Sequence, residues 1–451
     1  MDFIKTNRRL SEAQIQQRNN QSSIFPNQIS AGSFTPHSTI IEAALFNTKN
    51  VIYAAKNKQL HIVRRDLQVL CHELTHWCDF FGTIWGRNYI ESICRSYIAC
   101  GRNVETEFNM VIELFDIDRS LIAPKYYRFS HEPSSVHNGL IPWGMSCTTG
   151  VNIDPYGKPR EDKPIFFVNY YGSTSRNAFA RQPLSVGTLL ETRAIASEIN
   201  AIMTAISFFP NDGERSVEMT LINNEFRDMC YNRELIEYNT AAHFLSQTAK
   251  ISDIFETYKI SSMIAYIALN LKNGDFPKIK MPNEFSNVKK RAKYFQRQRD
   301  RGYAFAAMIY NGGIYNGNTE EYVNKCVKES GLGDLECILK SASEFLEREI
   351  LHSKDNHKYN KYYSTVNHFR REGKFGKNIC DILSALPSYS LTIEAIFNEF
   401  KEICPPIMDS EGEFIQFSKG RIDTYCPENM HDAAHELNEF TRNLLSGCRG
   451  I

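Results

Sequence analysis

One stretch of sequence, residues 67–82, most constrains what this chain can fold into. It contains no Lys or Arg. With a helical step of 100° per residue, its large apolar side chains gather on one side, namely Leu67, Leu70, Cys71, Leu74, Trp77, Cys78 and Phe81. Val69 and Phe80 flank the other side. Because a helix that is apolar nearly all round is buried, we predict a buried helix that begins near Arg65 and Asp66 and ends at Gly82.

This predicted helix also carries the sequence His72-Glu73-Leu74-Thr75-His76, an H-E-x-x-H motif. His72 and His76 lie one turn apart on one face, close enough to bind one metal ion, and Glu73 is placed to hold a metal-bound water. Burying two histidines and a carboxylate costs free energy unless a partner satisfies them, and a metal ion is such a partner. The alternative is a pair of core histidines satisfied by hydrogen bonds, with Glu73 as an ordinary helix former.

A second pair with the same spacing, His431 and His435, provides a comparison. It falls in a helix predicted over residues 429–447, whose apolar stripe is formed by Ala433, Leu437, Phe440 and Leu444. The two histidines project the opposite way, among charged and polar neighbours. We therefore expect this second pair to lie on a solvated face and to bind no metal.

Catalytic zinc needs a third protein ligand, and a second helix over residues 185–203 offers one. Glu191 and Glu198 share an apolar face of this helix, where a carboxylate requires a partner. We choose Glu191 as the third ligand and leave Glu198 as either a supporting carboxylate or the ligand itself. Asp79 lies too far along the helix from His72 to join it in binding one ion, so we expect it to orient His76.

An H-E-x-x-H helix followed by a Glu-bearing helix resembles the gluzincin group of zinc metallopeptidases. His72, Glu73 and His76 match the motif, and Glu191 in Leu-Leu-Glu-Thr-Arg-Ala takes the place of the downstream glutamate. No Asn-Glu-x-x-Ser-Asp sequence surrounds Glu191, so the resemblance does not extend to the thermolysin-like branch. The resemblance implies a zinc cofactor, a water nucleophile and hydrolysis of peptide bonds in a protein or peptide substrate.

In that mechanism the zinc ion, held by His72, His76 and Glu191, lowers the pKa of a bound water and polarises the scissile carbonyl. Glu73 takes a proton from the water and passes it to the leaving amine. A further donor stabilises the oxyanion. The sequence leaves four candidates for that donor: Tyr170, Tyr171, Arg193 and His243.

The amino-acid composition indicates which classes of binding partner are expected and in which cellular compartment the protein lies. With 52 basic and 52 acidic residues the net charge is zero, which gives no argument for binding nucleic acid or an anionic membrane. The 12 cysteines include no C-x-x-C pair, which favours reduced core thiols over a disulfide framework. The polar N-terminus lacks the apolar segment of a signal peptide, and apolar runs such as 262–269 are too short to span a bilayer. We expect a cytoplasmic protein without membrane contact.

The order of patterns along the chain predicts an α+β protein that is mainly helical. We expect a polar N-terminal arm over residues 1–36 and a zincin-like catalytic domain over 37–214. Residues 123–187 are rich in Pro, Gly, Ser and Asn, and we interpret them as an irregular insertion with one strand-like run at 164–171. Residues 215–451 are predicted to form a mainly helical domain.

The C-terminal half leaves two further interpretations open. It contains a basic run with interleaved aromatics over residues 289–301, a pattern that can bind nucleic acid but is equally well explained by a solvated helix face. In a peptidase, the helical half is a candidate to bind a regulatory protein partner. One alternative to a peptidase is a non-catalytic, zinc-containing protein whose helical half binds a partner and whose metal is structural or vestigial. The other, less favoured, is a helical scaffold that binds nucleic acid.

Overall fold

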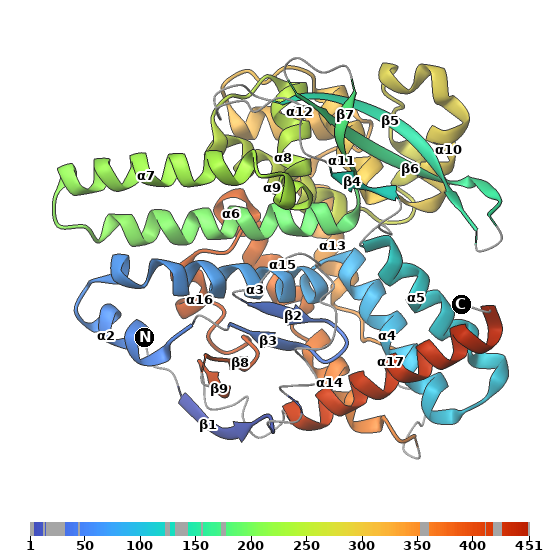
Figure 1. Ribbon diagram of the computed structural model, residues 1–451, viewed down its shortest axis with the longest axis horizontal. Helices are drawn as coiled ribbons and strands as arrows, with labels where there is room; N and C mark the ends of the chain where they lie inside the picture. Colours follow the sequence, from blue (N-terminus) through green and yellow to red (C-terminus); the bar gives the residue numbers. More distant parts are fainter. Residues whose placement is uncertain are drawn as a thin grey trace. The chain divides into compact units, whose positions relative to one another are not determined.

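The computed structural model of this chain is α+β and mainly helical, which confirms the predicted class (Figure 1). The structure describes residues 4–11, 14, 32–43, 46–121, 127–130, 143–154, 157–172, 177–351, 360–410, 412–417 and 426–449. These residues form two compact units, each assembled from separate stretches of the chain. Within the described part of the chain, no helix combines the length and the apolar character that a bilayer span requires.

The first unit comprises residues 1–118, 197–215 and 342–451. Its described strands form a mixed sheet in the order β1-β9-β8-β3-β2, with bounds β1 (Ile4–Arg9), β9 (Glu413–Gln416), β8 (Ile407–Met408), β3 (Ile40–Glu42) and β2 (Ser33–Thr35). β3 and β8 pair in parallel and the other neighbours are antiparallel. The predicted polar arm falls largely outside the described residues, but its described ends, β1 and β2, are strands of this sheet.

Helix α3 (Arg64–Gly82) is the central helix of the first unit, and it matches the predicted buried helix closely. All seven side chains of the predicted apolar side are at most 1 % exposed. α3 packs against β2, β3, α4 (Ile84–Arg102) and α15 (Gly376–Ala385). A Cβ at Gly82 would lie 2.3 Å from Ile379 Cγ2 of α15, so a glycine at the end of α3 permits this close packing.

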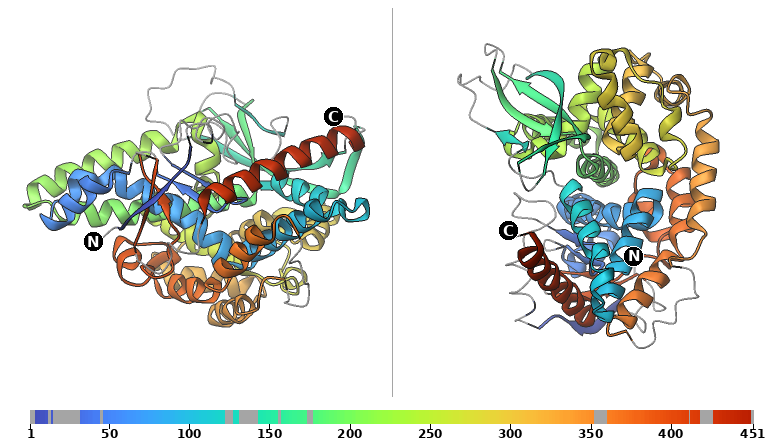
Figure 2. Two further views of the ribbon diagram at one scale, coloured as in Figure 1. Left: turned by 90° about the horizontal axis from the view of Figure 1, so that it is seen from below. Right: turned by 90° about the vertical axis from the view of Figure 1, so that its right-hand side faces the viewer.

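Helix α4 is tied to the C-terminal segments of the same unit by the buried guanidinium of Arg87. Its Nη1 donates to the carbonyl of Arg348 at 2.5 Å, and its Nη2 donates to the carbonyls of Leu346 and Gly373 at 2.7 and 2.8 Å. The last helix, α17 (Pro427–Arg449), packs against α4, α14 (Tyr363–Gly373), β1 and β3 (Figure 2). Residues 342–451 thus fold with the N-terminal part of the chain.

The expectation of a solvated face on this last helix is wrong at His431, which is only 4 % exposed. The reason is that α17 packs against both helices and strands, so more than its apolar stripe is covered. The Nδ1 atom of His431 lies 3.4 Å from the Asp432 carboxylate. Among the described residues, however, neither His431 nor His435 joins a group of side chains that could hold a metal.

The second unit comprises residues 119–196 and 216–341. Its described strands form an antiparallel sheet in the order β4-β7-β6-β5, with bounds β4 (Phe129–Ser130), β7 (Ala178–Pro183), β6 (Pro159–Tyr171) and β5 (Gly144–Ile153). The prediction of an irregular insertion over residues 123–187 is therefore wrong, because the described part of this segment is mostly sheet. The strand-like run at 164–171 is confirmed as part of β6.

The remainder of the second unit is helical. Helix α10 (Lys289–Gln298) packs against β6, and α8 (Ile236–Ala249), α9 (Ile254–Asn270) and α11 (Arg301–Gly312) pack against one another. The basic run lies mostly on α10, with Ala292 and Phe295 buried and Lys289, Lys290, Lys293 and Arg297 exposed. This is the arrangement of a solvated helix face.

Helix α6 (Val186–Ser207) is one unbroken helix (Figure 1). Its residues up to Ala196 count with the second unit and those from Ser197 with the first. The predicted boundary at 214/215 falls beside the division between Arg215 and Ser216, inside helix α7 (Asp212–Cys230) rather than in a linker.

Candidate metal centre

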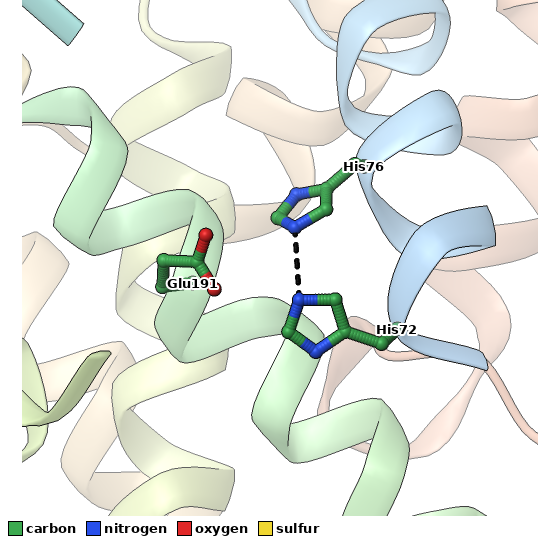
Figure 3. Close-up of side chains that lie close together, drawn as sticks. All are labelled: His72, His76 and Glu191. Carbon is green, nitrogen blue, oxygen red and sulfur yellow. Dashed lines mark hydrogen bonds between the residues drawn. The ribbon is translucent and has the colours of Figure 1, made fainter. Parts of the chain in front are cut away.

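The two histidines of the motif and Glu191 form a cluster that could hold a metal ion. His72, His76 and Glu191 each offer one ligand atom, and these atoms lie within 4.8 Å of one another. Figure 3 shows both imidazoles projecting from α3 toward the carboxylate of Glu191 on α6. The sequence prediction therefore selected three side chains that the structure brings together.

The spacing of the two imidazoles suits a tetrahedral ion. Their Nε2 atoms lie 3.1 Å apart. Two zinc–nitrogen bonds of 2.0–2.1 Å in tetrahedral geometry place the nitrogens about 3.3 Å apart. A donor set of two imidazole nitrogens and one carboxylate is also one that catalytic zinc sites use. The donor set and the spacing of the two imidazoles therefore fit a zinc ion.

A second glutamate on α6 fixes the orientation of the His72 ring. Nδ1 of His72 lies 2.5 Å from Oε1 of Glu198, and both side chains are largely buried. A carboxylate accepts the proton on Nδ1, which leaves Nε2 of the neutral ring unprotonated and able to bind a metal. Of the two roles left open for Glu198, this contact supports that of a residue that positions a ligand.

The periodicity of α6 explains why both glutamates reach α3. Glu191 and Glu198 are seven residues apart, so they share one face and lie about 10 Å apart along the helix axis. Near Glu198 a hydrogen bond also connects the two helices, because the hydroxyl of Thr75 on α3 donates to Oγ of Ser197 on α6 at 2.8 Å. The Glu191 side chain is completely buried among apolar residues of the same helix, including Leu190 and Ala194.

Glu73 lies on α3 between the two histidines and is 6 % exposed. Its carboxylate lies against the backbone of Gly32, immediately before β2. A Cβ added at Gly32 would come within 2.8 Å of both Cγ and Oε1 of Glu73. Glycine at this position therefore leaves the space that the Glu73 carboxylate occupies.

Asp79 is fully buried on α3, one turn after His76. Its backbone carbonyl accepts a hydrogen bond from the Thr83 hydroxyl, which also caps the start of α4. The expected role of the Asp79 carboxylate in orienting His76 stays a prediction.

Sequence reasoning did not identify an ion pair that adjoins Glu191. Arg128 donates to Glu237 at 2.6 Å, and both side chains are largely buried. Burial raises the pKa of Glu237 to about 7; Arg128 opposes this shift, and the nearby negative charge of Glu191 adds to it. No motif marks either residue, because Arg128 lies in the segment interpreted as irregular and Glu237 in a helix without other signals.

The four side chains considered as oxyanion donors are engaged in contacts of the second unit. The Tyr170 hydroxyl donates to Thr240, and that of Tyr171 lies 3.0 Å from Oγ of Ser146. Arg193, two residues after Glu191 and so on the far side of α6, lies over the ring of Tyr266. The remaining candidate, His243, hydrogen-bonds the carbonyl of Cys230. None of these contacts marks its residue as the donor.

The arrangement combines three side chains that could hold a metal ion with a carboxylate, Glu73, that follows the first of them in the sequence. This is the set of groups that metal-assisted hydrolysis requires. Comparison with protein-family models, with curated proteins and with solved structures finds no match for this chain.

Proposed function

We propose that this chain is a zinc-dependent peptidase with a zincin-like centre. The single observation that supports the proposal is the convergence of His72, His76 and Glu191, in which His72 is followed directly in the sequence by Glu73. A purely structural zinc site is usually closed by four protein ligands and has no use for a neighbouring general base. Here three candidate ligands leave one position for a water molecule or a substrate.

When bound, zinc supplies Lewis-acid chemistry: it lowers the pKa of a coordinated water and polarises the scissile carbonyl. The residues of the chain hold the ion and transfer the proton. His72 and His76 bind through Nε2, and Glu198 keeps the His72 proton on Nδ1. Glu73 accepts a proton as the water oxygen bonds to the carbonyl carbon, and it returns the proton to the leaving amine as the C–N bond breaks.

The proposed substrate class is a peptide or protein, and the proposed location is the cytoplasm. None of the cysteines whose side chains the structure describes forms a disulfide, and most of them are buried. Burial raises the pKa of Cys71 and of Cys94 far above the ordinary value, which keeps these thiols protonated and unreactive. Reduced core thiols are typical of a cytoplasmic protein.

The test is the variant Glu73→Gln, assayed with a quenched fluorescent peptide library and with zinc analysis of the purified protein. We expect the variant to retain one zinc per chain and to lose at least about a hundredfold in cleavage rate. The matched control is Glu402→Gln, which removes an exposed carboxylate of the same unit and leaves cleavage unchanged.

Cleavage by Glu73→Gln at the parent rate would overturn the mechanism. A parent protein that binds zinc at these residues but cleaves nothing in the library would favour the non-catalytic, partner-binding alternative instead. A parent protein that binds no zinc would contradict both.

A further inference from the structure

A cavity of about 250 Å³ lies within the second unit, apart from the metal ligands. It is lined by the end of α7, by α8 and by the start of α9, and it is partly open to solvent. Its walls include Arg227, Tyr231, His243, Ser246, Ile254 and Tyr258. The volume is slightly below the ~300 Å³ at which pockets for drug-sized ligands begin, so it suits a small molecule with one or two rings. We call it the α8–α9 cavity.

His243 gives this cavity a hydrogen-bond acceptor. Its Nε2 lies 2.7 Å from the carbonyl oxygen of Cys230, and a carbonyl can only accept, so Nε2 carries the proton. Burial lowers the pKa of His243, which keeps the ring neutral. Nδ1 of a neutral ring with this tautomer is an acceptor, available to an N–H or O–H group of a ligand in the cavity.

Aromatic packing holds the His243 ring in place. The ring stacks on Trp143 at a centroid distance of 5.8 Å and an interplanar angle of 28°, and it meets Tyr170 and Tyr231 edge to face at 5.6 and 5.5 Å. Gln247 of α8 anchors Trp143 by donating to its carbonyl. An acceptor held by three ring contacts and one hydrogen bond is pre-organised, which lowers the entropic cost of binding.

Arg227 gives the cavity a cation. It is an exposed residue of α7, one turn before Tyr231, and within the described part of the chain its guanidinium takes part in no salt bridge. Tyr231, Tyr258 and Ile254 also line the cavity and give it flat and apolar wall. A guanidinium recognises a carboxylate with paired hydrogen bonds.

We propose that the α8–α9 cavity binds a small organic anion with a flat apolar body, of the aromatic carboxylic acid class. Its carboxylate pairs with Arg227, its ring packs against Tyr231, Tyr258 and Ile254, and an N–H or O–H group donates to Nδ1 of His243. The inference does not depend on the proposed peptidase activity, because no metal ligand lines the cavity.

The experiment is isothermal titration of the full-length protein with indole-3-acetate, which carries a carboxylate, an indole ring and one N–H donor. Two related probes test the features separately: 1-methylindole-3-acetate lacks the donor, and tryptamine replaces the anion with a cation. We expect indole-3-acetate to bind, the methylated probe to bind about tenfold more weakly, and tryptamine not to bind. Repeating the titration with a chelator leaves the result unchanged if the carboxylate binds in the cavity.

Two charge-removing variants locate the site. Arg227→Gln weakens indole-3-acetate binding by about tenfold or more, because it removes the paired cation. The matched control, Lys259→Gln, removes an exposed cation of α9 that does not line the cavity, and it leaves binding unchanged. The proposal is overturned if Arg227→Gln binds as tightly as the parent, if tryptamine binds as well as indole-3-acetate, or if indole-3-acetate gives no heat of binding at millimolar concentration.

Discussion

Nδ1 of His72 lies 2.5 Å from Oε1 of Glu198, while Nε2 of the same ring faces Nε2 of His76 at 3.1 Å. One side of the imidazole is thus held by a carboxylate and the other side points toward the second histidine. This is the orientation that a metal-binding histidine needs. The contact with Glu198 leads to the first prediction.

Replacing Glu198 with Ala is expected to weaken zinc binding by about ten- to a hundredfold, because His72 loses the partner that fixes its ring and tautomer. The measurement is a zinc titration against a competing chelator. Glu198→Gln retains an acceptor for Nδ1 of His72, so its zinc affinity should lie between those of the parent and of Glu198→Ala. The control is Glu402→Ala, an exposed residue of the same unit. Parent-like zinc affinity in Glu198→Ala would show that the contact plays no part in metal binding.

Zinc itself is expected to stabilise the folded chain. An ion that binds only the native state at a free concentration of a hundred times its dissociation constant adds about 2.7 kcal/mol to the free energy of unfolding. Thermal unfolding with and without zinc measures this effect. In Glu191→Gln, which keeps the shape but loses the charge of the third ligand, the zinc-induced rise in melting temperature should largely disappear. An equal rise in parent and variant would remove Glu191 from the ligand set.

The residues of the candidate metal site were accessible to sequence reasoning because helical periodicity is a local property. A known motif placed His72 and His76 on one face of α3, and the apolar setting of Glu191 and Glu198 marked a second helix with carboxylates that require partners. The Glu198 contact then followed from the seven-residue spacing. The side chains that share a face of one helix follow from short-range relationships, whereas the contact between α3 and α6 joins segments more than 100 residues apart.

What escaped prediction depends on contacts between distant segments. In the strands of residues 144–183, apolar and polar side chains do not alternate regularly. The reason is that both faces of the sheet are covered there, so consecutive residues such as Phe166–Tyr170 are buried. The burial of His431 depends on the packing of α17 against four other elements, and a helical wheel of α17 alone cannot show these contacts. The pairing of Arg128 with Glu237 joins residues from a strand-rich segment and a helix, and no local pattern links them.

The Arg128–Glu237 pair gives a prediction about stability. Arg128→Met leaves the Glu237 carboxylate buried beside Glu191 without its cation, which should cost about 3 kcal/mol of unfolding free energy. The double variant Arg128→Met/Glu237→Leu removes both charges and should recover most of that loss. Urea denaturation of the parent, both single variants and the double variant gives the coupling energy. A double variant no more stable than Arg128→Met would mean that the cost does not arise from the uncompensated charge.

The pH dependence of this cost has a definite sign. The pKa of Glu237 is about 7 in the folded protein, above its ordinary value, so folding favours its protonated form and its ionisation weakens stability as the pH rises through 7. Without Arg128 the ionised form loses its stabilising cation. The destabilisation by Arg128→Met should therefore be larger above pH 7 than below it.

A second pH effect is predicted in the first unit, where His37 lies between α4 and α5 (Asn109–Leu121). Its Nε2 lies 3.4 Å from Asp118 and 3.2 Å from the Tyr89 hydroxyl, which itself donates to Asp118. Burial lowers the pKa of His37, but the charge of Asp118 and hydrogen bonds from Asp118 and Asn438 outweigh it, so the net pKa is raised. Protonated His37 is therefore favoured by folding.

Because the folded pKa of His37 lies above the unfolded value, its contribution to stability is fully present below about pH 6.5 and is lost as the pH rises through the folded pKa. Asp118→Asn removes the carboxylate and should destabilise the protein by about 1 kcal/mol at low pH, and by less once His37 is neutral in the parent. Urea denaturation across this pH range measures the difference. Asp212→Asn, which removes a highly exposed carboxylate paired with Arg215, serves as the control and should show no such trend. An Asp118→Asn effect of the same size at every pH would mean that His37 is neutral throughout, and that the carboxylate stabilises the unit through its hydrogen bond with Tyr89 alone.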